Sequence, residues 1–374
     1  MPPSEESSAW VTLSRTPQLD NPCLAKALEV LGPAQIIAAS DAERQSAGIP
    51  AAARGYLSSR LAALKRAERA WLEHPRHHIV PFTHPRYPSL LRTAGRFPVA
   101  LYVDGNVDVL NEPQLAVVGS RNPTPQGRET AHELAEHLAL RGLTITSGLA
   151  AGIDSAAHRG ALEAQGITIG VLGSGIDVIY PPASRALGEE IPQRGALVSS
   201  FPLGTAPRRQ NFPQRNGIIA GMSLGTLVVE AARRSGSLIT ARLASDLGRE
   251  LFAIPGSIYN PLSRGCHELI RQGAKLTETA HDILSELDFS AFFSAPAPVC
   301  AERSTAPLGT PGMDKDRKIL LDALGFDQAD LDMMVVRTGF KAQAVSSMML
   351  ILELEGHVQA APGGRYSRVV RSRR

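Results

Sequence analysis

Between about residues 79 and 287, short apolar runs rich in β-branched residues alternate with amphipathic stretches of helical spacing. The runs expected to form strands are Leu115–Val118, Thr144–Thr146, Ile167–Leu172, Ala196–Ser199, Leu227–Val229 and Leu251–Ile254. The helices expected between them are Gln126–Arg141, Asp154–Gln165, Ala183–Ile191 and Leu238–Leu247. Strands that are apolar on both faces, each followed by a helix, form right-handed crossovers onto a parallel sheet. The pattern predicts a doubly wound α/β domain, in which ligands bind beyond the carboxyl ends of the strands.

Two regions of different texture flank this part. The chain up to Leu72 is alanine-rich with breaks at Gly32–Pro33 and Gly48–Pro50. That pattern predicts short helices, either as a small SAM-like or helix-hairpin-helix-like domain or as a plain helical cap. Residues 291–313 are rich in proline and small residues, which is typical of a linker. The predicted domains are therefore 1–78, 79–290 and 314–374, with 291–313 as the linker.

The last region has three helical stretches followed by a hairpin with Gly363–Gly364 at its turn, which predicts a winged helix. Its third helix, Ala342–Leu354, carries Glu353 and is followed by Glu355, so it is poorly equipped to read a major groove. The hairpin and tail carry cations that suit phosphate contacts without base readout: Arg365, Arg368, Arg371, Arg373 and Arg374. We expect an accessory contact with duplex DNA or with a protein.

Overall composition restricts the class of protein. Lysine and arginine number 39 against 36 acidic residues, a net charge of +3, so any nucleic-acid site must be a local patch. Three cysteines without a CxxC pair exclude a disulfide scaffold and a zinc finger. No apolar run approaches the ~18 residues that span a bilayer, and the first residues lack the pattern of a secretory signal. We expect a cytoplasmic protein with no membrane partner.

Glycine and small polar residues stand at the carboxyl ends of the predicted strands. The junction residues singled out are Gly119, Ser120, Arg121, Ser147, Gly148, Gly173, Ser174 and Gly175. Glycine lets backbone N–H groups approach an anion, and a helix that starts there adds the positive end of its dipole. One such turn is common for geometric reasons alone. Several on one sheet edge predict an anion-binding site.

Known nucleotide fingerprints are missing. The chain has no GxxxxGK[ST] segment, and Gly173-Ser-Gly175 does not continue as GxGxxG. We therefore expect neither a P-loop ATPase nor a dinucleotide-dependent dehydrogenase, and no cofactor. The histidines lack ligand spacing, so no metal site is predicted.

The most basic stretch of the α/β region is 206–216, expected to be a loop. It carries Arg208, Arg209, Phe212, Arg215 and Asn216. Arginines around one ring suit single-stranded nucleic acid, with charge for phosphates and a ring for a base. The alternative is a solvated loop whose Phe212 packs back on the sheet. Composition alone leaves both open.

Candidate catalytic groups are few. Asp154 and His158 lie at i, i+4 on one helix and are expected to hydrogen-bond to each other as packing residues rather than to act as a base. Gly225-Thr226 with Glu230 is similar to the GTxxE motif of nucleotide phosphoribohydrolases. Here the glutamate is one residue further on, and the preceding Pro-Gly-Gly is absent. We assign no catalytic residue and expect a protein that is not an enzyme, with such a hydrolase as the alternative.

Taken together, the motifs resemble one family, the DNA-processing protein A family, also called DprA or Smf. The matching segments are Val118–Arg121, Ser147–Asp154, Leu172–Asp177, Phe212–Asn216, Ser235–Thr240 and Phe252–Gly256. They occur in the family's order from about His84 to Leu284. The resemblance implies an extended Rossmann-like domain that binds single-stranded DNA and forms a homodimer. It also implies a mediator that protects incoming DNA and helps to load the RecA recombinase in natural transformation.

The same resemblance implies which residues form the DNA pocket. These are Gly119, Ser120, Arg121, Arg209, Phe212 and Asn216, with Arg215 and the Gly173–Gly175 turn as neighbouring candidates. The chain departs from the family at Gly217, where an arginine is usual, and at Ser200 before Phe201-Pro202, where the family usually has Glu. The first departure removes a cation near the pocket, so either the affinity is lower or Arg208 compensates. A phosphoribohydrolase and a pure protein-interaction scaffold are the rival classes.

Overall fold

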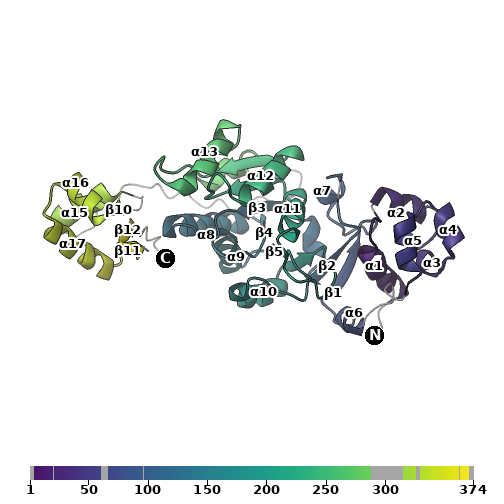
Figure 1. The fold of residues 1–374 in the computed structure, drawn as a ribbon. Helices are drawn as coiled ribbons and strands as arrows, with labels where there is room; N and C mark the ends of the chain where they lie inside the picture. Colours follow the sequence, from purple (N-terminus) through teal and green to yellow (C-terminus); the bar gives the residue numbers. More distant parts are fainter. Residues whose placement is uncertain are drawn as a thin grey trace.

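A nine-stranded sheet forms the middle of the chain in the computed structural model, with strand order β1-β2-β6-β5-β4-β3-β7-β8-β9 (Figure 1). The strands are β1 (His77–Pro81), β2 (Ala100–Gly105), β3 (Gln114–Val118), β4 (Thr144–Ser147), β5 (Thr168–Val171), β6 (Ala196–Ser199), β7 (Gly225–Val228), β8 (Glu250–Ala253) and β9 (Lys275–Leu276). The structure describes residues 4–19, 21–59, 66–95, 97–287, 315–325, 329–361 and 363–369. The predicted linker and Arg371, Arg373 and Arg374 lie outside the described residues.

Seven neighbouring strands run parallel, in the order β6-β5-β4-β3-β7-β8-β9, which confirms the predicted doubly wound sheet. Ala116 of β3 pairs with Thr146 of β4 on one side and with Thr226 of β7 on the other. The chain leaves β3 toward β4 and leaves β7 toward β8, in opposite directions, so the strand order reverses between β3 and β7. A doubly wound sheet opens its ligand crevice at this point.

Helices cover both faces of the sheet (Figure 1). They are α7 (Ser89–Arg92), α8 (Pro125–Leu140), α9 (Ile153–Glu163), α10 (Arg185–Glu190), α11 (Asn211–Met222), α12 (Ser237–Asp246), α13 (Arg264–Arg271) and α14 (Ala280–Leu284). Successive strand residues point to opposite faces. Leu115 and Val117 of β3 accordingly pack with α8 and α9, whereas Ala116 and Val118 belong to the core under α11 and α12. The apolar side chains of this one strand thus pack into two hydrophobic cores, one on each face of the sheet.

The six predicted strands are β3 to β8, and the four predicted helices are α8, α9, α10 and α12, each within two residues of the expected ends. The expectation of a loop at 206–216 was wrong, because α11 already begins at Asn211. Pro213 is compatible with that first helical turn, where a backbone N–H has no partner within the helix. Strands β1 and β2 were not predicted. β2 runs antiparallel to both β1 and β6, so the sheet carries one reversed strand.

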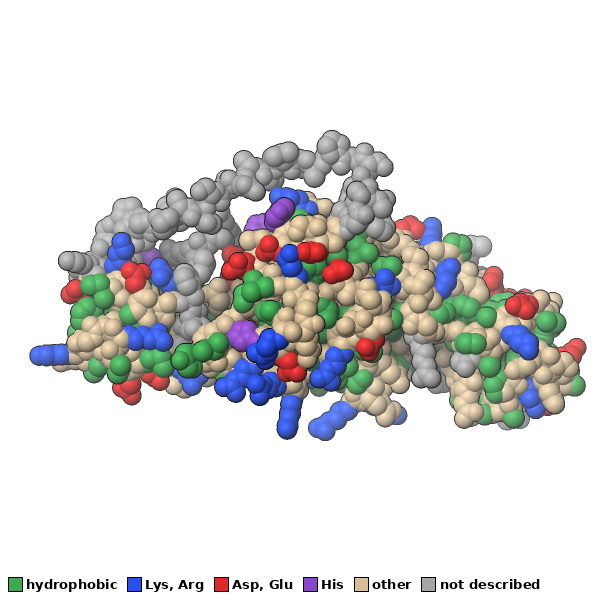
Figure 2. Space-filling view, turned by 90° about the horizontal axis from the view of Figure 1, so that it is seen from above, with side chains coloured by type: hydrophobic (Ala, Val, Ile, Leu, Met, Phe, Trp, Pro, Cys, Tyr) green, Lys and Arg blue, Asp and Glu red, His purple; other side chains and the backbone are tan. Residues whose placement is uncertain are grey.

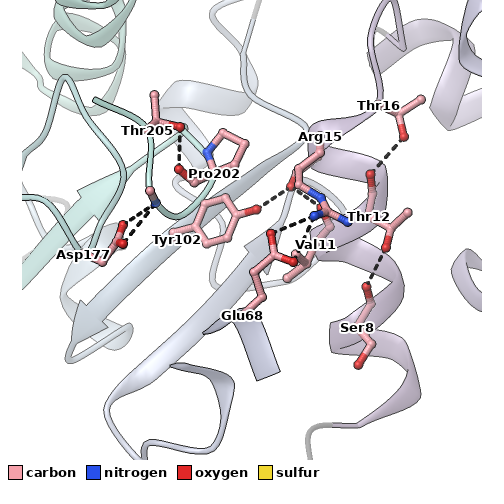
Figure 3. A network of polar contacts seen from close by, with 12 residues as sticks. Ser8, Val11, Thr12, Arg15, Thr16, Glu68, Tyr102, Asp177, Pro202 and Thr205 are labelled. Carbon is pink, nitrogen blue, oxygen red and sulfur yellow. Dashed lines mark hydrogen bonds and ion pairs between the residues drawn. The ribbon is translucent and has the colours of Figure 1, made fainter. Parts of the chain in front are cut away.

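Six short helices precede the sheet among the residues described there. They are α1 (Glu5–Arg15), α2 (Asn21–Leu28), α3 (Pro33–Ala38), α4 (Asp41–Ser46), α5 (Ala51–Leu57) and α6 (Arg66–Leu72). The buried ion pair of Arg15 with Glu68, 2.9 Å, joins α1 to α6 (Figure 3). The Ser14 hydroxyl lies 2.8 Å from the hydroxyl of Tyr102 on β2, and Trp71 packs against the same tyrosine. The first and last of these helices are thereby fixed to the edge of the sheet.

The C-terminal part is a winged helix, as predicted. It contains α15 (Lys315–Leu324), β10 (Ala329–Asp330), α16 (Leu331–Thr338), α17 (Ala342–Leu354), β11 (Val358–Ala361) and β12 (Arg365–Arg368). Its own small core includes Leu320, Met334 and Val345. Gly363 and Gly364 have φ values of +83° and +70°, which the tight turn between β11 and β12 requires. Among the described helices of the whole chain, none is both long and apolar enough to cross a membrane.

Candidate nucleic-acid interface

A cavity of about 500 Å³ opens where the strand order reverses, and we call it the β3–β7 cavity. Its walls are the loop after β3, the start of α11, and the loop between β7 and α12. The predicted site residues that line it are Gly119, Ser120, Arg121, Arg209, Phe212, Arg215 and Asn216. Segments almost 100 residues apart in the sequence therefore meet at one point of the sheet edge.

Glycines bring the loops of this cavity together. A Cβ atom at Gly119 would lie 2.6 Å from Cγ1 of Ile153, the first residue of α9. Gly152 has a φ of +84° and packs against the backbone oxygen of Ser120. The N–H of Ile153 donates to that same oxygen at 3.1 Å. The loop after β3 is thus held against the start of α9, with Arg121 at its exposed tip.

Phe212 lies at the centre of the arrangement. The guanidinium carbon of Arg121 is 5.3 Å from the centroid of its ring and that of Arg215 is 5.7 Å, both within the range of a cation–π contact. The Tyr180 ring lies 6.3 Å away at 48°. The half-buried Phe212 ring also packs on Gly173, where a Cβ atom would lie 3.0 Å from it. The ring packs back on the sheet, as one interpretation expected, and it also lines the cavity, where the nucleic-acid interpretation stays a prediction.

Three exposed arginines surround the opening: Arg121, Arg209 and Arg234. Within the described part of the chain, no carboxylate lies within 4.0 Å of their charged nitrogens. Their charge is therefore available to an anion. In the view of Figure 2, lysine and arginine side chains gather along one side of the central part of the molecule.

Arg215 behaves differently, although it lines the same cavity. Only 4% of the residue is exposed, and its guanidinium donates to the backbone oxygens of Gly148 and Val171, the latter at 2.7 Å. Burial lowers the pKa of Arg215 to about 10, which leaves it protonated at neutral pH. Asp154 compensates part of this cost, and its own pKa is raised by burial although Arg215 opposes the shift. Both hydrogen bonds use Nη1, and the burial of the side chain argues against the direct DNA contact that was expected of Arg215.

Six other predicted residues do not line the cavity: Arg208, Ser147, Gly148, Gly173, Ser174 and Gly175. The hydroxyl of Ser147 donates to the oxygen of Val117, and that of Ser174 donates to the oxygen of Val178, each at 2.6 Å. These hydroxyls were expected to face an anion, and that expectation was wrong because backbone carbonyls of the fold take their hydrogens. The three glycines are buried and give room to their neighbours: Gly148 to the Arg215 guanidinium and Gly173 to the Phe212 ring.

One wall of the cavity is formed by residues that were not among the predicted site residues. Arg234, Ser235, Gly236 and Ser237 line it from the β7–α12 loop. Nδ2 of Asn216 donates to the oxygen of Gly236 at 3.4 Å, which links this loop to α11. The sequence did contain a signal for these residues, because they form another stretch of glycine and small polar residues after a strand. Arg208, in contrast, is exposed but lies outside the lining.

The candidate catalytic groups have structural partners. Nδ1 of buried His158 lies 2.6 Å from Oγ1 of Thr168, and Asp154 turns away to accept from the N–H of Gly148 at 3.1 Å. The expected Asp154–His158 hydrogen bond was therefore wrong. Burial lowers the pKa of His158 to about 3, so the ring is neutral at pH 7.

The Glu230 carboxylate accepts from the N–H of Thr124 at 2.9 Å and from its hydroxyl at 2.6 Å. Thr124 is the N-cap of α8, so this carboxylate stabilises the start of the helix. Burial raises the pKa of Glu230, while the two hydrogen bonds oppose the rise. Across the described residues, no group of three or more His, Cys, Asp or Glu side chains is placed to hold a metal ion.

Two solved structures that resemble this chain are informative. The X-ray structure of DNA processing protein A from Streptococcus pneumoniae superposes with a TM-score of 0.65 and 36% identity, covering 77% of this chain and 100% of that one. A structure of DNA processing protein A from Helicobacter pylori, described as giving insight into its single-stranded DNA binding mode, has a TM-score of 0.51 and 28% identity. It covers 57% of this chain and 96% of that one.

The sequence comparisons agree. Protein Smf of Escherichia coli K12 is 44% identical over 295 residues, which is 79% of this chain and 78% of that protein. DNA processing protein DprA of Streptococcus pneumoniae is 46% identical over 203 residues, or 54% of this chain and 72% of that protein. Residues 301–364 match the DprA winged helix domain, and residues 78–288 match the family described as DNA recombination-mediator protein A. The chain belongs to the DNA recombination-mediator protein A (DprA/Smf) family.

Proposed function

We propose that this protein is a recombination mediator that binds single-stranded DNA in the β3–β7 cavity. The observation that carries the proposal is Phe212, a half-buried ring beside the guanidinium of Arg121, with Arg209 and Arg234 at the same opening. Recognition of single strands combines cations for the phosphates with rings on which bases stack. The single-stranded DNA binding described for the Helicobacter pylori relative supports this reading.

The roles divide by exposure and chemistry. Arg121, Arg209 and Arg234 would contact phosphates through charge-assisted hydrogen bonds, and Phe212 would stack on a base. Ser120 and Asn216 line the same cavity and carry groups that can donate a hydrogen bond, and Gly119 offers its backbone N–H. Arg208 would extend the basic surface beyond the opening. Arg215 would act indirectly, by holding the loop of Gly148 and the base of α11 in place.

Membership of the family supports the wider biological role. We infer that the DNA-bound protein acts as a homodimer, protects incoming single strands in natural transformation and helps to load the RecA recombinase. A mediator of recombination must hold the single strand onto which the recombinase is loaded, and the cavity supplies the means of holding it. The winged helix would add an accessory contact.

The proposal assigns no chemical step to the cavity, and the phosphoribohydrolase alternative is not favoured. The glutamate that resembled that motif, Glu230, uses both carboxylate oxygens on Thr124. Its place is the N-terminus of α8 rather than the lining of the β3–β7 cavity. Incubation of the protein with nucleoside monophosphates, followed by chromatography for the free base, tests the alternative. Release of base that Glu230→Ala abolishes would revive it.

The binding proposal is tested by fluorescence anisotropy with labelled single-stranded and duplex DNA. Removing two charged contacts in Arg121→Ala/Arg209→Ala should weaken single-strand binding about 100-fold or more, since each is worth about 1.5–3 kcal/mol. The slope of log affinity against log salt should flatten by about 1.4, at ~0.7 per phosphate contact on a single strand. Arg233→Ala is the matched control, because Arg233 is exposed beside Arg234 but outside the cavity. Unchanged affinity in the double variant would refute the site.

A further inference from the structure

Two aromatic side chains stand out by exposure. Among the described residues, the aromatic side chains that are exposed rather than buried or half-buried are Tyr180, at 44%, and Tyr259, at 84%. Tyr180 follows β5 and Tyr259 follows β8, so both lie beyond the carboxyl ends of parallel strands. In the strand order β5-β4-β3-β7-β8 they lie on opposite sides of the β3–β7 cavity. Four strand spacings of ~4.8 Å separate the two strands by about 19 Å.

A second cavity of about 550 Å³ lies beside Tyr259, and we call it the β8 cavity. The first turn of α8 contributes Gln126 and Thr130, and the loop after β8 contributes Asn260. The winged helix closes the other side through Arg365 and Ser367 of β12. In Figure 1 the winged helix lies beside α8, at the end of the molecule opposite the N-terminal helices.

The two cavities are neighbours on one sheet edge. Leu262 lines the β3–β7 cavity, while Pro261 and Ser263 on either side of it line the β8 cavity. The N–H of Ala231 donates to the oxygen of Leu262 at 2.6 Å, which joins the loop after β7 to the loop after β8. The cavities are therefore separated by a ridge that is one residue wide on each loop, with Ala231 on one loop and Leu262 on the other.

The loop that carries Tyr259 is ordered by its own hydrogen bonds. The N–H of Tyr259 donates to Oγ of Ser257 at 3.3 Å, and the N–H of Asn260 donates to the Ser257 oxygen at 3.0 Å. Oδ1 of Asn260 accepts from the N–H of Leu262 at 3.0 Å. Nε2 of His267 lies 2.9 Å from the oxygen of Gly256. The exposed ring is thus presented on a fixed turn, which lowers the entropy that a stacked base must overcome.

The two cavities differ in formal charge, and this difference indicates which kind of ligand group each cavity favours. The β3–β7 cavity is lined by four arginines and one aspartate. The β8 cavity is lined by two arginines, Arg337 and Arg365, and two acids, Glu230 and Asp330, so its formal charge cancels. Phosphates therefore favour the first cavity. The second suits an uncharged group with hydrogen-bonding edges.

Ser367 points to the same conclusion from the other wall. The residue is 1% exposed, and its Oγ has no hydrogen-bond partner among the described residues. A buried hydroxyl without a partner costs free energy that a polar ligand in the cavity would recover. A nucleobase carries several such donor and acceptor groups on its edge, together with a flat face for Tyr259.

We propose that a single strand held in the β3–β7 cavity continues across the Ala231–Leu262 ridge and places a base against Tyr259, in the β8 cavity. The inference rests on the proposed function and adds a second binding site, made jointly by the sheet edge and the winged helix. It gives the winged helix a contact with the same single strand, through Arg365 and Ser367. A strand of about six nucleotides, at ~3.4 Å per stacked nucleotide, covers the 19 Å between the strands of the two tyrosines.

The test compares full-length wild type, Tyr259→Ala and Tyr259→Phe on single strands of 4 and 15 nucleotides by fluorescence anisotropy. Tyr259→Ala should weaken the 15-nucleotide complex about 5- to 150-fold, which is the range for losing one base–aromatic stack. The 4-nucleotide strand, held mainly by Arg121, Arg209 and Arg234 of the first cavity, leaves fewer nucleotides for the second cavity and should be weakened less. Tyr259→Phe keeps the ring and should bind both strands as the wild type does. Arg365→Ala should weaken the longer complex more than the shorter one.

A 2-aminopurine base moved stepwise along the 15-nucleotide strand gives a direct readout, since stacking on tyrosine quenches its fluorescence. We expect one position that is quenched in the wild type and in Tyr259→Phe but not in Tyr259→Ala. If the longer strand binds Tyr259→Ala as tightly as the wild type, the second site is wrong, even where Arg121→Ala/Arg209→Ala confirms the first. If no variant or wild type binds single strands, the proposed function fails and the inference fails with it. If Tyr259→Ala keeps its single-strand affinity and loses only the binding of a partner protein, Tyr259 is a protein contact and the proposal is overturned.

Discussion

Arg121 and Arg215 both approach the Phe212 ring, at 5.3 and 5.7 Å, yet the structure gives them different tasks. The Arg215 guanidinium is buried with the Asp154 carboxylate nearby and bonds two backbone oxygens. Arg121 is exposed. Replacing each by methionine keeps a long, unbranched side chain and removes the charge. We expect Arg215→Met to damage stability and Arg121→Met to damage DNA binding.

The size of the first effect follows from burial. Without Arg215, the Asp154 carboxylate keeps its desolvation cost and loses its counter-charge, while the oxygens of Gly148 and Val171 lose a donor. Leaving a buried charge uncompensated in this way costs about 3–5 kcal/mol. At about 2–4 °C per kcal/mol for a unit of some 200 residues, the melting temperature should fall by roughly 6–20 °C. The exposed Arg121 contact with Phe212 is worth about 0.5–1 kcal/mol, so Arg121→Met should melt within a few degrees of the wild type.

Thermal unfolding followed by circular dichroism measures both variants, and anisotropy at 10 °C measures DNA binding of the folded protein. Arg215→Met should keep most of its affinity there and the wild-type salt slope, whereas Arg121→Met should bind more weakly and with a salt slope flatter by about 0.7. Adding Asp154→Asn to Arg215→Met removes the uncompensated charge and should restore part of the stability. If Arg215→Met melts like the wild type and fails to bind single strands, Arg215 is a DNA contact and the reasoning from burial is refuted.

Three further predictions follow from individual residues. Because the pKa of His158 falls to about 3 on folding, the unfolded chain binds a proton that the folded chain does not. The free energy of unfolding should drop by about 1.4 kcal/mol per pH unit from pH 6.5 toward 3. Urea titrations should show a shallower drop in His158→Gln. An equal drop in that variant would contradict His158 as the origin of the pH dependence. A Cβ atom added at Gly217 would meet no atom within 4 Å, so Gly217→Arg should fold. It should steepen the salt slope of single-strand binding by about 0.7, with Gly217→Ala as the uncharged control, and an unchanged slope would place position 217 away from the strand. Glu230→Ala should lower the free energy of unfolding by about 1–3 kcal/mol through its lost bonds to Thr124. Melting curves equal to those of the wild type would refute its capping role.

The fold could be predicted where sequence periodicity decided it. β3 to β8 are short apolar runs, and each lies between amphipathic stretches whose spacing is unambiguous. β1 and β2 gave no such signal, since they pair with each other across the 18 residues between Pro81 and Ala100, and β2 attaches to β6 far along the chain. That pairing depends on contacts between distant segments, which a local pattern does not contain.

The candidate site divides in the same way. Exposed cations at strand ends, such as Arg121 and Arg209, could be found because topology brings all strand ends to one edge. The burial of Arg215 could not, since it depends on the space that Gly148 leaves and on Asp154 turning toward the loop after β4. Ser147 was misassigned for a similar reason, because the carbonyl that takes its hydrogen belongs to the neighbouring strand β3. Residue type predicts which chemistry is possible, and packing decides whether it faces a ligand.

The net charge of +3 illustrates why a total is a poor guide to a binding site. The four arginines and one aspartate that line the β3–β7 cavity carry the same +3 within about 500 Å³. At physiological salt, charges separated by more than about 8 Å on an exposed surface are largely screened from one another. The acidic residues elsewhere therefore cancel the sum without weakening the field at the opening. Buried Arg215 and Asp154 offset each other, so the charge that a phosphate meets comes from Arg121, Arg209 and Arg234, and these three should set the salt dependence of binding.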